Sequence, residues 1–266
     1  MNTDRRGFTL VELIVVAVLG TLVVAAALQV LITNQRTYTA GNAKIQGQQT
    51  TRAAMDILTN ELREISAQGG DILAMGGDSL TIRAMRKFAI VCEVNLSAPP
   101  KLKAFKVGDW FEADDSVFVF ADNDQAVSSD DTWIAAKVTA VDTTASCGGT
   151  TAQELTFSGQ SATFTADSVR TGAPIRSFTR FTYGLVTYNG DTYLGRRDAS
   201  GTEAPLVGPL ASNGVSVTYL DGNGNVTTTP TDVRQVLVTI RTSSGVLSSL
   251  GEMVADSITT RIYTRN

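Results

Sequence analysis

The residues best suited to bind a ligand are four aspartates that lie close together in the sequence, Asp122, Asp124, Asp130 and Asp131. Carboxylate oxygens gathered in one loop are the ligands that calcium prefers in proteins. We therefore treat these four aspartates as candidate calcium ligands, with a solvated acidic loop as the simpler alternative. We expect no other resident cofactor.

Two further groups of acidic and amide side chains make poorer candidates. The first group is Asp109, Glu112, Asp114 and Asp115, and the second is Asp221, Asn223 and Asn225. The second group lacks the glutamate that completes an EF-hand loop. The glycines between its members favour a turn instead.

The composition excludes several classes of enzyme. The 266-residue chain contains no histidine and two cysteines, which rules out histidine-based triads and all-cysteine zinc or iron–sulfur sites. It contains no Walker A sequence, no Rossmann fingerprint and no serine nucleophile elbow. The net charge of −4 argues against a nucleic-acid surface. We expect a protein that is not an enzyme and recognises no specific nucleic acid.

The N-terminus carries the strongest signal, an apolar segment over residues 8–32. As a helix it would be about 38 Å long, enough to cross a hydrocarbon core of roughly 30 Å. Arg5 and Arg6 precede it, so the positive-inside rule places the N-terminus in the cytoplasm and the rest outside. A signal peptide cleaved near residues 25–27, or a plain signal anchor, would also fit. Neither explains Glu12, because a carboxylate in a membrane helix is costly and indicates a function.

Residues 6–13, Arg-Gly-Phe-Thr-Leu-Val-Glu-Leu, resemble the class III leader of type IV pilins and type II secretion pseudopilins. The resemblance implies that a prepilin peptidase cuts between Gly7 and Phe8 and then methylates the new amine of Phe8. It also implies that the remaining helix stays in the inner membrane and later packs among other major and minor pilins. Glu12 would pair with the Phe8 amine of a neighbour, so assembly removes an unpaired charge on each side. A tip adhesin or an exported substrate is a further candidate partner.

A second helical signal follows the apolar segment. Residues 33–52 are rich in Asn, Gln and Thr, which fits a polar linker or the locally loosened helix that the resemblance favours. Apolar residues then recur along one helix face, at Met55, Leu58, Leu62 and Ile65. The glycines in residues 68–71 predict the end of this helix. We expect a leader (1–7), a membrane and assembly helix (8–32), a polar and then amphipathic half-helix (33–68) and a β-rich head (69–266).

The rest of the chain is predicted to form strands. The expected ranges are 79–84, 88–94, 116–121, 133–141, 154–157, 175–188, 192–197, 215–220, 226–229, 234–242 and 257–264. Residues 117–120 are apolar on both faces, as in a central strand, whereas residues 215–219 and 236–240 alternate as in half-solvated strands. Asn189-Gly190 predicts a tight hairpin, and residues 221–225 predict another.

These elements predict an α+β fold in which a long N-terminal helix packs on an antiparallel sheet. The resemblance implies the lollipop shape of a pilin, with a protruding half-helix and a globular head. Residues 193–197, 205–207, 215–223 and 261–266 resemble PilW-type minor pilins and J-type minor pseudopilins. Residues 88–166 match no pattern.

The cysteines Cys92 and Cys147 stand alone in the sequence. After export they would meet an oxidising compartment, where a disulfide is the usual state. Such a bridge would remove about 4 kcal/mol of unfolded-state entropy in the simple chain model. Two free buried thiols are the alternative, and a catalytic cysteine would lack a histidine to activate it.

Two classes of function follow. The first is a structural minor pilin that helps to assemble or prime a type IV pilus or related filament, with a minor pseudopilin of type II secretion or DNA uptake as a variant. The second is a periplasmic ligand-binding domain on a simple membrane anchor. For the first class, the resemblance implies a single-pass inner-membrane protein with a periplasmic head that later enters a pilus or pseudopilus near its tip.

Overall fold

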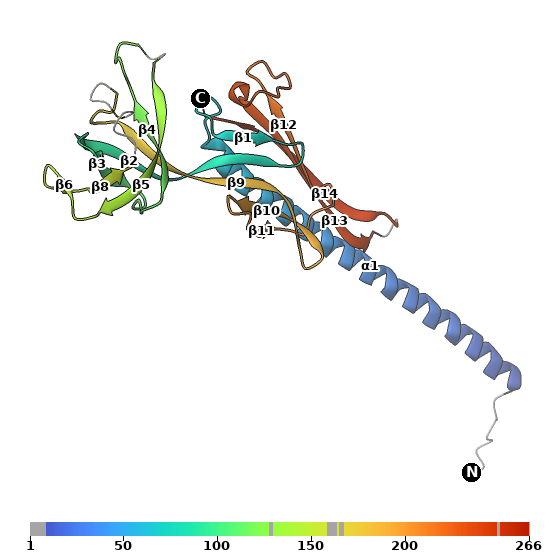
Figure 1. The fold of residues 1–266 in the computed structure, drawn as a ribbon. Helices are drawn as coiled ribbons and strands as arrows, with labels where there is room; N and C mark the ends of the chain where they lie inside the picture. Colours follow the sequence, from blue (N-terminus) through green and yellow to red (C-terminus); the bar gives the residue numbers. More distant parts are fainter. Residues whose placement is uncertain (1–8, 128–129, 159–163, 165–167, 249–250, 266) are drawn as a thin grey trace.

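The computed structural model describes residues 9–127, 130–158, 164, 168–248 and 251–265. It begins with a long helix, α1 (Leu10–Arg63), which protrudes from the head over its N-terminal half (Figure 1). Residues 33–52 are α-helical throughout, so they continue the helix without a break and do not form a linker. The fold is the expected pilin-like α+β lollipop.

The C-terminal half of α1 is held by the head. Its predicted apolar stripe is buried, including Met55, Leu58 and Leu62, and it packs mainly against strands β13 (Gln235–Leu247) and β14 (Met253–Tyr263). Gly47 allows the close approach, because a Cβ there would lie 2.9 Å from Thr242 Oγ1. The stripe therefore serves as core packing, as its spacing predicts.

The predicted end of the helix is wrong by about one turn. Helix α1 ends at Arg63, before the glycines of residues 68–71. The reason is a turn organised by the buried Asp71, whose Oδ2 accepts from the Ser66 backbone N–H at 2.8 Å. The Ser66 hydroxyl accepts in turn from the Gly69 N–H at 3.0 Å. The chain thus leaves the helix and forms a turn around the Asp71 carboxylate.

Strands β12 (Val215–Leu220), β13 and β14 form an antiparallel sheet beside α1. The predicted alternation is confirmed, because Val217, Val236 and Ile240 are buried. The predicted strand at residues 226–229 is wrong: only a bridge from Leu220 to Val226 forms there. A short 3-10 turn, η1 (Pro230–Asp232), then leads into β13.

A second sheet contains the remaining long strands in the order β1, β2, β3, β8, β5, β4, β9, β10, β11. Their bounds are β1 (Ile72–Met75), β2 (Leu80–Asn95), β3 (Lys101–Val107), β4 (Ser116–Ala121), β5 (Thr132–Asp142), β8 (Gln153–Phe157), β9 (Pro174–Tyr188), β10 (Asp191–Asp198) and β11 (Glu203–Val207). Strands β6 (Ser146–Cys147) and β7 (Thr150–Thr151) form a small separate hairpin. The two strands predicted at 79–84 and 88–94 are one long strand, β2, with an irregularity between Met85 and Phe88. Strands β1, β3, β6, β7 and β11 lie outside the predicted ranges.

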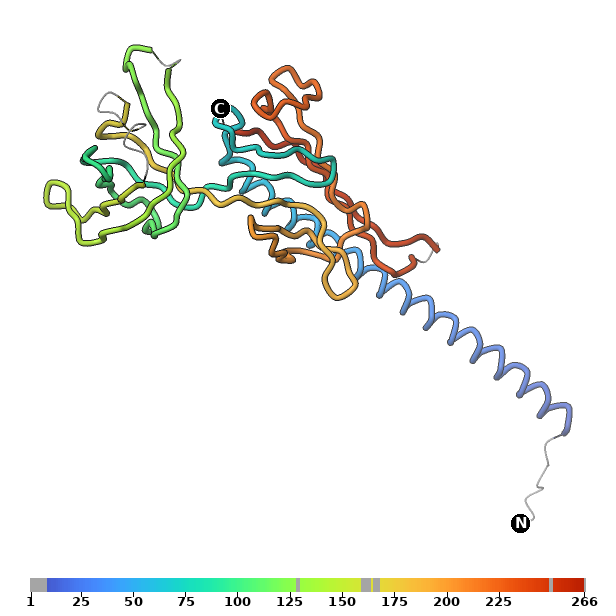
Figure 2. Tube along the Cα trace, in the orientation of Figure 1, coloured from blue at the N-terminus to red at the C-terminus, as the bar shows by residue number. Residues whose placement is uncertain are grey.

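The head consists of two lobes that share strands β2 and β9 (Figure 2). The second part of β2 pairs with β3 on one side and with the start of β9 on the other, where Phe88 lies opposite Arg176. Because β4 also pairs with the start of β9, the strands β2-β3-β8-β5-β4-β9 close into a barrel. We call residues 86–177 the barrel lobe and the remainder of the head, with the C-terminal half of α1, the helix lobe.

Each lobe has its own apolar core. The barrel core includes Val91, Leu102, Val119, Leu155, Phe157 and Ile175, and the helix-lobe core includes Leu58, Leu62, Ile82, Leu194, Val236 and Ile240. A disulfide joins Cys92 to Cys147 inside the barrel lobe, with the Cα atoms 6.3 Å apart, so the free-thiol alternative is wrong. Residues 88–166, which match no sequence pattern, make up most of this barrel.

We expect the barrel lobe to fold on its own. A fragment of residues 86–178 retains β3, β4, β5, β8, the barrel parts of β2 and β9, the disulfide and the barrel core. Its two ends are neighbours because Phe88 pairs with Arg176. Thermal unfolding followed by circular dichroism should show one cooperative transition. A control fragment of residues 86–173 lacks β9, cannot close the ring and should give no such transition. Equal behaviour of the two fragments would contradict the closed-barrel interpretation.

Candidate functional site

The first candidate site is the free end of α1. Thr9 is the N-cap of the helix, and its hydroxyl accepts from the Glu12 backbone N–H at 3.3 Å. The Glu12 carboxylate lies in the first helical turn, where the helix dipole favours a negative charge. Gly7 and Phe8 lie outside the described residues, so cleavage between them and methylation of Phe8 stay predictions.

The surface around Glu12 is apolar and uncovered. Side chains from Leu10 to Ile32 are exposed, and the head buries no part of this segment. The helix is long and apolar enough to cross a membrane. A surface of this kind needs lipid or other apolar helices around it. A carboxylate within it needs a positive partner, and the described residues of this half-helix supply no salt bridge to Glu12.

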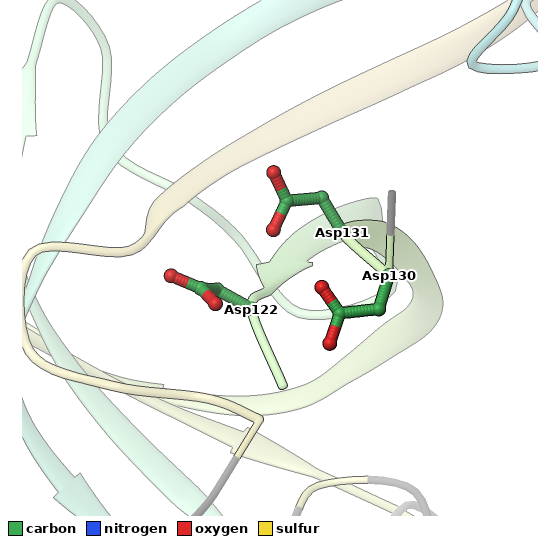
Figure 3. Close-up of side chains that lie close together, drawn as sticks. All are labelled: Asp122, Asp130 and Asp131. Atoms are coloured by element: carbon green, nitrogen blue, oxygen red, sulfur yellow. The ribbon is translucent and has the colours of Figure 1, made fainter. Parts of the chain in front are cut away.

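The second candidate site is the acidic loop between β4 and β5. Figure 3 shows Asp122, Asp130 and Asp131 together, and one carboxylate oxygen from each lies within 4.8 Å of the others. One oxygen each of Asp122 and Asp130 is buried and has no hydrogen-bond partner among the residues that the structure describes. Desolvation and then the charges of Asp122 and Asp130 raise the pKa of Asp131. Three of the four predicted ligands are thus brought together.

Asp124 is the exception among the predicted ligands. Its Oδ1 accepts from the Ala126 backbone N–H at 3.0 Å, so it stabilises its own turn. Calcium takes six to eight oxygen ligands, and a cluster of three carboxylates is also what a solvated acidic loop presents. Calcium binding therefore stays a prediction of the sequence.

The other acidic groups have structural roles. In the first group, Asp115 forms an ion pair with Lys87 at 2.9 Å and Asp114 forms one with Lys137 at 2.7 Å. In the second, the Asp221 carboxylate accepts from the backbone N–H groups of Asn225 and Asn223. The Asn225 N–H is the main reason why the pKa of Asp221 is lowered. This second group is the turn that its glycines predict.

A cleft between the two lobes was not predicted. It has a volume of about 490 Å³ and is lined by Gly69, Asp131, Trp133, Arg176 and Arg265, among others. Arg176 donates to Asp71 at 2.7 and 3.2 Å, and its guanidinium lies 4.7 Å from the centre of the Trp133 ring. Arg176 is thus already paired with Asp71 and packed against the Trp133 ring. No short-range signal in the sequence indicates this contact, because Asp71 and Arg176 are far apart along the chain.

Comparison with known proteins identifies the N-terminal segment. Residues 2–28 match the prokaryotic N-terminal methylation motif, a range that contains Gly7, Phe8 and Glu12. No curated protein and no solved structure matches the chain. The protein therefore has a pilin-like N-terminus: it carries the class III leader motif that prepilin peptidase processes, followed by a helix long and apolar enough to cross a membrane.

Proposed function

We propose that this protein is a minor pilin of the PilW type, which is cut between Gly7 and Phe8, methylated on Phe8 and built into a type IV pilus or related filament. The observation that carries the proposal is the protruding half of α1, which combines the methylation motif with an exposed apolar surface and a single acidic residue, Glu12. Such a helix can stand in the membrane as a single subunit and in a helical bundle after assembly.

The shape of the head supports a place near the filament tip. The barrel lobe lies past the C-terminal end of α1, on the side away from the membrane segment (Figure 1). If new subunits join from the membrane side, a subunit already ahead of this one would have to fit around that lobe. A subunit at the tip meets no such obstacle.

Two alternatives remain distinct from this proposal. A minor pseudopilin of type II secretion or DNA uptake would use the same helix, and the genes that flank this one would distinguish the machines. A periplasmic ligand-binding protein on a simple anchor would need neither the cut at Gly7 nor Glu12. The engaged state of Arg176 and Trp133 in the cleft between the lobes counts against that alternative.

The test is the intact mass of the mature protein isolated from membranes. We expect the loss of residues 1–7 and the addition of one methyl group at Phe8. Replacing Gly7 with a bulky residue should leave the leader in place, because the peptidase must approach the bond on the carboxyl side of Gly7. A mature N-terminus after Ala27, or an uncut chain, would contradict the proposal and favour a signal peptide or a plain anchor.

A further inference from the structure

The hairpin that connects β13 to β14 reaches back along α1 toward the membrane segment (Figure 1). Leu247, at the end of β13, pairs with Met253, at the start of β14. A groove separates the end of this hairpin from the helix, and it is lined by Ile32, Arg36 and Thr39 on the helix and by Val246, Leu247 and Gly251 on the hairpin. The hairpin end therefore faces the helix across this groove, at the point where the apolar segment ends.

The length of the helix gives the position of the hairpin end relative to the membrane. Because α1 is continuous, residues 10–32 span about 33 Å at 1.5 Å per residue, close to the roughly 30 Å of a hydrocarbon core. When these residues cross the membrane, Ile32 lies at the outer edge of the hydrocarbon, and Thr39 lies about 10 Å further out. The end of the hairpin is then level with the lipid headgroups.

The side chains at this height suit a headgroup layer. Leu247 is 54% exposed and Met253 is 57% exposed, whereas further along β14 the exposed residues are mostly polar, such as Ser257 and Thr259. Tyr38 on the helix is 72% exposed, and tyrosine is enriched where membrane meets water. The charged Arg36 and Glu252 can stay among the headgroups and water.

We propose that the hairpin end, residues 245–248 and 251–253, dips into the periplasmic surface of the inner membrane while the subunit awaits assembly. The occupant is lipid, because the hairpin end lies beside the outer end of the membrane helix, across a groove, and exposes two large apolar side chains there, Leu247 and Met253. Apolar side chains at the boundary between headgroups and acyl chains are buried by several ångströms of lipid. This second contact holds the head at one tilt on the membrane and is lost when the subunit enters a filament.

The proposal rests on the membrane-inserted stage of the proposed function, so its test must separate the two. A single cysteine is introduced at position 247 or 253 of the full-length protein and labelled with an environment-sensitive fluorophore. It is the only free thiol, because Cys92 and Cys147 are joined to each other. The labelled protein is placed at low density in phosphatidylethanolamine–phosphatidylglycerol vesicles that carry a quencher either near the headgroup or deep in the acyl chains.

Two control positions set the scale. Val18→Cys lies in the middle of the apolar helix. Val226→Cys replaces an equally apolar side chain that is 72% exposed, in the loop between β12 and β13, at the other end of that sheet. We expect labels at 247 and 253 to shift to the blue and to be quenched by the shallow quencher. The label at 18 should be quenched by the deep one, and the label at 226 by neither.

The outcomes separate the hypotheses. If the label at 18 is quenched but those at 247 and 253 behave like the one at 226, the hairpin proposal is wrong and the membrane stage stands. If the label at 18 also stays in water, the membrane stage itself is wrong. If positions 247 and 253 are protected only in sheared filaments, a neighbouring subunit covers them, and the lipid contact is overturned.

Discussion

Replacing Asp71 with alanine should lower the free energy of unfolding of the head by about 3–5 kcal/mol, the usual cost of breaking a buried ion pair by removing one partner. Asp71 is 0% exposed and Arg176 is 6% exposed. The two side chains form a two-point contact at 2.7 and 3.2 Å. In the variant, the Arg176 guanidinium would stay buried without a countercharge. The loss of stability should be greatest at the junction of the lobes, where this pair joins the turn after α1 to strand β9.

Urea unfolding of the full-length protein in detergent measures this effect, and two controls sharpen it. Glu203→Ala removes the carboxylate of an exposed ion pair with Arg197, which should cost at most about 1 kcal/mol. Arg176→Met removes the buried cation but leaves the bond from the Ser66 N–H to Asp71. The two single variants and the Asp71→Ala/Arg176→Met double variant form a double-mutant cycle. This cycle gives the coupling energy between the two side chains, apart from the contribution of Asp71 to the turn. If Asp71→Ala costs no more than Glu203→Ala, the pair does not hold the junction.

Local signals predict the elements whose structure depends on their own residues. The apolar run of residues 117–120 becomes β4, a strand between β5 and β9. Asn189 and Gly190 adopt φ angles of 52° and 90° and form the turn between β9 and β10, as the dipeptide predicts. The motif around Glu12 is equally local, since it depends on residue types next to one another. Such features can be read without knowing what lies across the fold.

Features that depend on distant partners could not be predicted. The helix ends early because Asp71 is held by Arg176, 105 positions away in the sequence. The barrel closes through pairings of β9 with both β2 and β4, which no spacing within one strand reveals. Strand β11 contains Pro205, a residue that disfavours strands, and the proline is tolerated because β11 lies at the edge of its sheet.

The candidate cation site, too, could be predicted only in part. The composition of the loop predicts that acidic residues gather there, and Asp122, Asp130 and Asp131 do. It does not predict that Asp124 turns away to accept from the Ala126 N–H. An aspartate can accept from the backbone N–H two residues later, as Asp124 does, but residue type alone does not say which aspartates of a loop will do so.

Replacing Glu12 with alanine should leave membrane levels and leader cleavage normal but strongly reduce entry of the subunit into filaments. Lipid already satisfies apolar helix surfaces, so packing alone discriminates poorly between registers. A charge pair does discriminate: at an effective dielectric of about 20, two charges about 4 Å apart attract by roughly 4 kcal/mol before desolvation is subtracted. If only about 1.4 kcal/mol of this survives, incorporation falls about tenfold.

The measurement is the ratio of this subunit in sheared filaments to that in membranes, together with the activity of the machine. Glu12→Gln should behave like Glu12→Ala, because the amide keeps the shape but not the charge. Thr9→Ala is the matched control: it removes the hydroxyl that caps the same helix end and should reduce helix stability by about 1 kcal/mol, yet it keeps the carboxylate. If both Glu12 variants enter filaments as the native chain does, Glu12 is not a docking charge. A place ahead of all other subunits, where no neighbour's amine meets Glu12, would be the first explanation to examine.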